Sequence, residues 1–108
     1  MKYLAILASV LLISFSSCSD EDLPICVEEI LTDFRTDACI GSGEFTTWRF
    51  RGQTVYCFDF GSCEPIRFIE IYDADCILVC ELGGTNGINV CDGTEWSSAE
   101  FISTVFRR

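Results

Sequence analysis

The sequence contains no histidine, and this absence excludes more chemistry than any residue that is present. Without an imidazole, the chain cannot carry Ser-His-Asp or Cys-His nucleophilic catalysis, nor a zinc site with a histidine ligand. Lysine occurs once, at Lys2, so nearly all positive charge comes from arginine. The chain also lacks an apolar run of the ~20 residues that a membrane-spanning helix needs.

The longest apolar run, residues 3–15, follows Lys2 and is followed by Ser16-Ser17-Cys18. It covers about two thirds of the length that a bilayer span needs, so it is interpreted as the apolar part of a signal peptide. Small residues before a cysteine resemble a bacterial lipobox, and the acidic run Ser19-Asp20-Glu21-Asp22 resembles the surface-export signal of Bacteroidota lipoproteins. We therefore expect a lipoprotein signal peptide at residues 1–17, and a lipid on Cys18 followed by a tether at residues 18–23. The alternative is an ordinary signal peptide, with Cys18 as a disulfide partner.

A lipid on Cys18 predicts a location on the outer membrane, exposed at the cell surface. After residue 17 the chain carries six arginines against seventeen acidic residues, a formal charge of −11. This charge repels nucleic acid and anionic lipid head groups, so neither is an expected partner. We expect contact with the membrane through the lipid on Cys18.

Seven cysteines remain if Cys18 is lipidated, and they are the disulfide candidates: Cys26, Cys39, Cys57, Cys63, Cys76, Cys80 and Cys91. So many cysteines in a short exported chain predict a disulfide-stabilised fold. At most three bridges form within one chain, and one thiol is left over. Cys76 and Cys80 are four apart, which fits neither a thioredoxin-type redox motif nor a four-cysteine zinc site. No metal and no cofactor are expected, and the pairing is left open.

Residues 24–108 predict one small α+β domain of about four short antiparallel strands, with one helix near each end. The first helix begins at Pro24 and ends near residues 35–37, with one apolar face: Val27, Ile30, Leu31 and Phe34. Aromatic and β-branched residues predict strands at residues 45–50, 54–60, 66–72 and 76–82. A capping box from Ser97 to Glu100 predicts the last helix, whose core-facing residues are Phe101, Ile102, Val105 and Phe106.

The first two predicted strands are joined by Arg51-Gly52, which suits a two-residue hairpin loop. This register pairs Trp48 with Val55 and Thr46 with Cys57 on one face. On the other face it pairs Phe45 with Phe58 and Thr47 with Tyr56. Both faces carry large apolar groups, so the hairpin should be covered on both sides. Asp73-Ala74-Asp75 predicts a turn, in preference to a calcium site, because no further ligands follow at EF-hand spacing.

Several of these segments together resemble a small cysteine-rich family of unknown function that is common in Bacteroidota lipoproteins. The resemblance spans about residues 26–93 and rests on these residues: Cys26-Val27-Glu28-Glu29-Ile30, Gly52-Gln53-Thr54-Val55-Tyr56, Cys63, Tyr72-Asp73, Cys76, Cys80, Gly83-Gly84, Gly87 and Cys91. It implies no activity, cofactor or catalytic residue. Cys39 and Cys57 lie outside the pattern, so one of them is expected to be unpaired. A free Cys57 would be buried, whereas a free Cys39 would be exposed in a loop.

We expect a non-catalytic module that binds or assembles with a glycan or protein partner. Aromatic rings stack on sugars and on peptide side chains, so a possible binding surface consists of Phe45, Arg49, Tyr56, Phe58 and Phe60. Alternatively, these rings form the core beneath a helix. A second possible function is inhibition of a protease or other enzyme through the glycine-rich loop at residues 83–89. A carboxylate or thiol enzyme is the third possibility, although so small a domain rarely builds a cleft.

Overall fold

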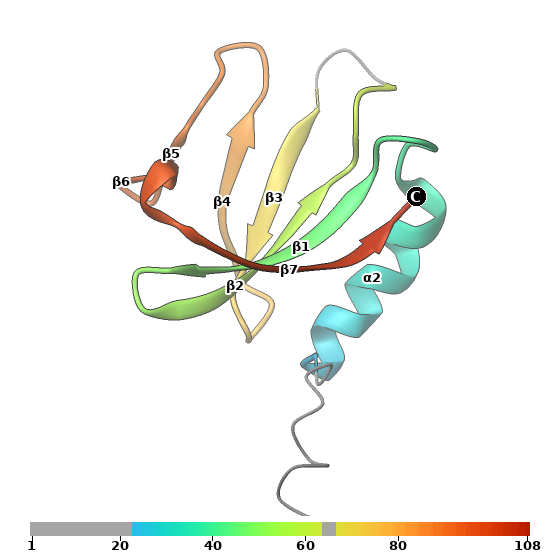
Figure 1. The fold of residues 1–108 in the computed structure, drawn as a ribbon, viewed down its shortest axis with the longest axis horizontal. Helices are drawn as coiled ribbons and strands as arrows, with labels where there is room; N and C mark the ends of the chain where they lie inside the picture. The colour runs from blue at the N-terminus through green and yellow to red at the C-terminus, as the bar shows by residue number, and fades with distance from the viewer. Residues whose placement is uncertain (1–22, 64–66) are drawn as a thin grey trace, which may run out of the picture.

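A computed structural model describes residues 23–63 and 67–108, which form a five-stranded antiparallel sheet with one α-helix across one face (Figure 1). The strand order is β4-β3-β2-β1-β7. The bounds are α2 (Ile25–Asp37), β1 (Glu44–Phe50), β2 (Gln53–Asp59), β3 (Phe68–Tyr72), β4 (Leu78–Gly83) and β7 (Glu100–Arg107). A two-stranded sheet of β5 (Val90–Cys91) and β6 (Thr94–Glu95) and a 3-10 helix, η1 (Trp96–Ser98), lie between β4 and β7.

The β1–β2 hairpin has the predicted register. Trp48 lies opposite Val55, and Phe45 lies opposite Phe58. Arg51 (φ 54°) and Gly52 (φ 80°) form the two-residue loop. Positive φ at both loop positions matches the twist of the flanking strands, which is why glycine follows arginine here.

Two apolar clusters cover the two faces of this hairpin, so the expectation of cover on both sides is confirmed. Beneath α2 the buried residues are Val27, Leu31, Phe34, Ala38, Phe45, Tyr56 and Phe58. On the opposite face they are Phe50, Val55, Cys57, Ile71, Leu82 and Cys91, with Trp48 and Trp96 packed against them. The central position of β2, between β1 and β3, follows from this double burial.

Helix α2 turns its apolar face to the sheet, as predicted, with Val27, Leu31 and Phe34 buried. Its last turn is bonded by an arginine from the far end of the sequence. Arg108 Nη1 donates to the carbonyl oxygens of Thr36, at 2.6 Å, and Ala38, at 3.1 Å. A cation at the negative end of a helix dipole is stabilising, so Arg108 fastens α2 to the end of β7.

The predicted last helix is wrong, because residues 100–107 form β7 on the edge of the sheet. Ser97 lies in η1 and caps no α-helix. Phe101 packs edge-on against Trp48 on one face, whereas Phe106 packs against Phe34 on the other. A helix with a single apolar stripe cannot place two residues on opposite faces of a sheet. The β-branched residues Ile102, Thr104 and Val105 between them favour a strand, and the edge of β1 supplies its partner.

The predicted strand count is also too low. The described residues form seven strands and one α-helix, which lies toward the N-terminal side. The four predicted strands correspond to β1–β4, with β3 beginning at Phe68; the predicted start at Ile66 lies outside the described residues. Residues 1–22, including Cys18, the signal peptide and most of the tether, also lie outside them. Within the described residues, no helix is both long and apolar enough to cross a membrane.

Three disulfides join distant parts of the chain. Cys26–Cys76 ties the first turn of α2 to the β3–β4 turn, Cys39–Cys63 joins the two segments that follow α2 and β2, and Cys80–Cys91 ties β4 to β5. Cys57 is the free thiol among the described residues and is buried. The expected exposed Cys39 is wrong, because Cys39 is 3% exposed and bonded to Cys63.

Candidate binding site

The five residues of the expected aromatic surface do not form a surface. Phe45 and Phe58 are fully buried and stack at 4.3 Å between ring centroids. Phe60 is half-buried against Phe34, with Arg67 over its ring, and Arg49 is exposed on β1. The alternative interpretation, that these rings form the core beneath a helix, is confirmed for Phe45, Tyr56 and Phe58. An aromatic residue at alternate positions of a strand is buried wherever a helix covers that face.

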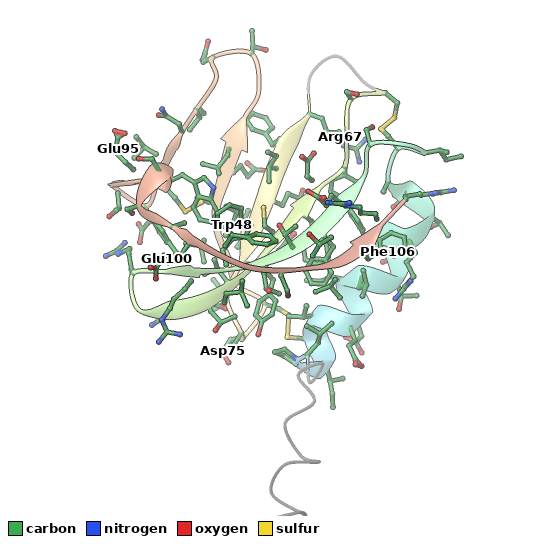
Figure 2. All side chains as sticks on the ribbon, viewed as in Figure 1. Trp48, Arg67, Asp75, Glu95, Glu100 and Phe106 are labelled. Carbon is green, nitrogen blue, oxygen red and sulfur yellow. A yellow bond between two sulfur atoms is a disulfide. The ribbon has the colours of Figure 1, made fainter. Side chains whose placement is uncertain are left out.

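Tyr56 is the member of that set that also borders open space. It lines a hollow of about 400 Å³ between the β1–β2 hairpin and the β3–β4 turn. We call this the hairpin-end hollow, and its lining residues are Gln53, Thr54, Tyr56, Asp73, Ala74 and Asp75. Figure 2 shows Asp75 on the turn at the lower edge of the sheet.

The antiparallel register brings these residues together. Tyr56 on β2 lies opposite Tyr72 on β3, so the hairpin loop and the segment after Tyr72 emerge at the same end of the sheet. The disulfide from Cys26 to Cys76 holds this turn beside the first turn of α2. The hollow therefore has one wall on the hairpin and one on a disulfide-anchored turn.

The β3–β4 turn is organised by Asp73, as the turn prediction expects. Asp73 Oδ1 accepts hydrogen bonds from the backbone N–H of Asp75, at 2.9 Å, and of Ile77, at 3.0 Å. Such bonds are the usual reason for aspartate in a turn. Asp73 Oδ2 has no partner among the described residues, so it remains available as an acceptor. No group of three possible metal ligands occurs in the described part of the chain.

The Tyr56 side chain combines deep burial with an unused hydroxyl. Only 7% of Tyr56 is exposed, and its hydroxyl has no hydrogen-bond partner in residues 23–63 and 67–108. Every fully buried side-chain oxygen in this part of the chain is hydrogen-bonded, so the Tyr56 hydroxyl, which has no such partner, is open to solvent. The Tyr56 side chain lines the hairpin-end hollow. Burial raises the pKa of Tyr56 above its ordinary value, which already lies well above neutral pH, so the hydroxyl is protonated there.

The charge of the hairpin-end hollow comes from two carboxylates, those of Asp73 and Asp75, and no cation lines it. A second hollow, of about 300 Å³, adjoins it and shares Gln53 and Asp73. There Arg51 bonds to Asp92 at 3.0 Å, so cation and carboxylate are already paired. The two hollows therefore differ in electrostatic character.

The Cys57 thiol is poorly suited to nucleophilic chemistry. It lies in the core on the face opposite α2. Burial raises its pKa to about 11, with smaller contributions from nearby Asp59 and Glu44, although a hydrogen bond with Thr46 opposes the shift. Because the thiolate is the reactive form, a thiol with this pKa is nearly unreactive at neutral pH.

Sequence reasoning missed two features. It treated Gln53, Thr54 and Asp73 only as strand, turn or motif residues. The polar residues that flank the hairpin loop and the β3–β4 turn were the signal that could have indicated a site. It also did not join Trp48, Trp96 and Phe101, whose rings pack together with Phe101 55% exposed. The loop considered for inhibition forms a short exposed turn, closed by two backbone bonds between Gly83 and Ile88.

Comparison with known proteins identifies a family and no characterised relative. No curated protein and no solved structure matches the chain. A family model described as a domain of unknown function, DUF6970, matches residues 41–108. The match begins after α2 and contains all seven strands of the described residues, both walls of the hairpin-end hollow and five of the seven cysteines that follow the tether. The chain therefore belongs to the DUF6970 family.

Proposed function

We propose that this chain is a non-catalytic binding module, held at the cell surface by a lipid on Cys18, that engages its partner through the hairpin-end hollow. The observation that carries the proposal is Tyr56, a mostly buried side chain that lines a polar hollow and whose solvent-open hydroxyl has no partner among the described residues. A hydroxyl that is open to solvent and has no protein partner can bond to a ligand in place of water. Its position on a side chain that lines a polar hollow supports a binding site there.

The architecture around the hollow supports binding without conformational change. The hairpin wall belongs to the strand at the centre of the sheet, and the turn wall is fixed by Asp73 and by the Cys26–Cys76 disulfide. Rigid walls reduce the entropy that is lost when a ligand binds. The acidic chain would also favour partners that carry positive charge.

Photo-crosslinking in cells tests the contact surface. A benzophenone amino acid in place of Gln53, which is exposed and lines the hollow, should give a covalent adduct of defined mass on irradiation. The same amino acid in place of Asn86, which is exposed in the loop after β4, serves as the matched control. Adding Tyr56→Phe, which removes only the hydroxyl, should reduce the Gln53 adduct severalfold. Equal adducts from both positions, or none from Gln53, would refute the proposed surface.

The proposed anchor rests on the signal-like residues 3–15 and on Ser16-Ser17-Cys18. Two or more acyl chains hold a protein stably on a membrane, whereas one chain gives marginal binding. Cells grown with an alkyne-tagged fatty acid should label the wild-type chain strongly. The Cys18→Ala variant should show no label and should leave the membrane fraction, as judged by immunoblotting. Equal labelling of the two chains would show that the lipid is elsewhere or absent.

A further inference from the structure

We infer that the hairpin-end hollow binds a cationic group, the ammonium of a lysine or the guanidinium of an arginine on a partner protein. The inference rests on the proposed binding function and adds the class of ligand. Every polar side chain in the lining can accept hydrogen bonds, and none is a cation: Gln53, Thr54, Tyr56, Asp73 and Asp75. An ammonium or guanidinium group has donors only, which makes it the complement of such a lining.

The charge of the hairpin-end hollow favours a cationic ligand. Asp73 and Asp75 both border the hollow, and neither forms an ion pair in the described residues. The nearest arginine along the hairpin, Arg51, is held by Asp92 through its side-chain and backbone oxygens, at 3.0 and 3.1 Å. Arg51 is therefore paired in the adjoining hollow, and the carboxylates of Asp73 and Asp75 at the hairpin end have no cation paired with them in the described part of the chain.

The placement of the hydrogen-bond acceptors in the hollow also favours a cation. Asp73 uses Oδ1 to hold the turn and leaves Oδ2 free, so the carboxylate is fixed in orientation before a ligand arrives. The protonated hydroxyl of Tyr56, a side chain that lines the hollow, still has lone pairs to accept a bond. A charge-assisted bond to a fixed carboxylate is stronger than a bond between neutral groups. A cation can thus bond to a free carboxylate oxygen and to a phenolic oxygen.

A bound metal ion fits these residues less well. Calcium takes six to eight oxygen ligands, and two separate carboxylates, one of them engaged in a turn, supply too few. A neutral sugar would use the same acceptors, but it would not draw on the uncompensated charge of Asp73 and Asp75. Sugar binding is therefore one of the outcomes that the experiment separates.

To test this, the mature protein is purified from cells and kept in mild detergent. It is then titrated with Nα-acetyl-lysine-N-methylamide and, separately, with methylguanidinium. Backbone 15N–1H signals of residues 53–56 and 73–76 should shift saturably, with a dissociation constant in the millimolar range because each probe is a single side chain. Asp73→Asn keeps an oxygen for the turn but loses the charge, and should weaken binding about tenfold. Asp33→Asn removes an exposed carboxylate from α2 and should leave the affinity unchanged.

Tyr56→Phe should weaken binding severalfold while leaving the stacked core intact. If Asp73→Asn disturbs signals throughout the spectrum, Asp75→Asn takes its place with the same expected direction. Equal shifts with sodium chloride at matched ionic strength, or equal losses from Asp33→Asn and Asp73→Asn, would overturn the inference as general electrostatics. A response to methyl glucoside without a response to the cations would also overturn it. The crosslinking test of the proposed function is independent of these results.

Discussion

Replacing Phe34 by alanine is expected to lower the free energy of unfolding by about 3–5 kcal/mol, the range for deleting a buried phenylalanine side chain. Phe34 is 1% exposed and joins α2 to β2, to the residue that follows β2 and to β7. Its ring lies edge-on to Phe58 at 5.2 Å, Phe60 at 4.9 Å and Phe106 at 6.1 Å between centroids. Alanine would leave a cavity among these three rings, and the loss of packing adds to the loss of apolar burial.

Urea denaturation followed by tryptophan fluorescence measures this loss, since Trp48 and Trp96 report on the sheet. Ile25→Ala is the matched control, because Ile25 is in the same helix but is 78% exposed. A surface change of this kind should cost no more than about 0.5 kcal/mol. If the two variants unfold at the same urea concentration, α2 contributes little to stability and the sheet forms without it.

The hairpin was predictable because its information is local. Arg51-Gly52 fixes the loop length, and the loop length fixes which residues lie opposite each other. Alternating large apolar residues on both faces then required cover on both sides. The same holds for α2, whose spacing of Val27, Leu31 and Phe34 specifies one buried face.

The strand β7 was not predictable from local pattern. Phe101, Ile102, Val105 and Phe106 fit one stripe of a helix, and a serine and glutamate before them fit a capping box. The ladder to β1 shifts register twice, so the regular alternation that marks a strand is lost. What decides the outcome is the free edge of β1, more than fifty residues earlier, and no local window contains it.

The hairpin-end hollow was hidden for a related reason. Gln53 and Asp73 belong to different turns, and only the β2–β3 register places them together. Tyr56 was identified as a possible contact, but for its ring and not for its hydroxyl. Likewise, the odd number of cysteines predicted one free thiol. The pairing of Cys63 with Cys39, in contrast, depends on where the segment after α2 passes, which the sequence does not show. Contacts between distant segments are the part that spacing alone does not determine.

Removing the Cys26–Cys76 disulfide is expected to cost about 4 kcal/mol, the chain-entropy value for a crosslink that spans roughly fifty residues. The sequence separation is 50 for this bridge, against 11 for Cys80–Cys91, for which the same relation gives about 3 kcal/mol. The double variants Cys26→Ala/Cys76→Ala and Cys80→Ala/Cys91→Ala therefore make a matched pair. Thermal and urea unfolding of both, beside the wild-type chain, measures the order of the two losses.

The two bridges also differ in what they hold. Cys91 is fully buried in the core opposite α2, so its loss adds a packing defect, whereas Cys76 is only half-buried. A larger loss from Cys80→Ala/Cys91→Ala would mean that packing outweighs chain entropy.

The Cys26–Cys76 bridge, in contrast, holds the turn that carries Asp73. Its removal should therefore weaken binding of the lysine probe even at temperatures where the chain stays folded, whereas loss of Cys80–Cys91 should not. Equal affinity in both variants would show that Asp73 and its two backbone bonds alone shape the hollow.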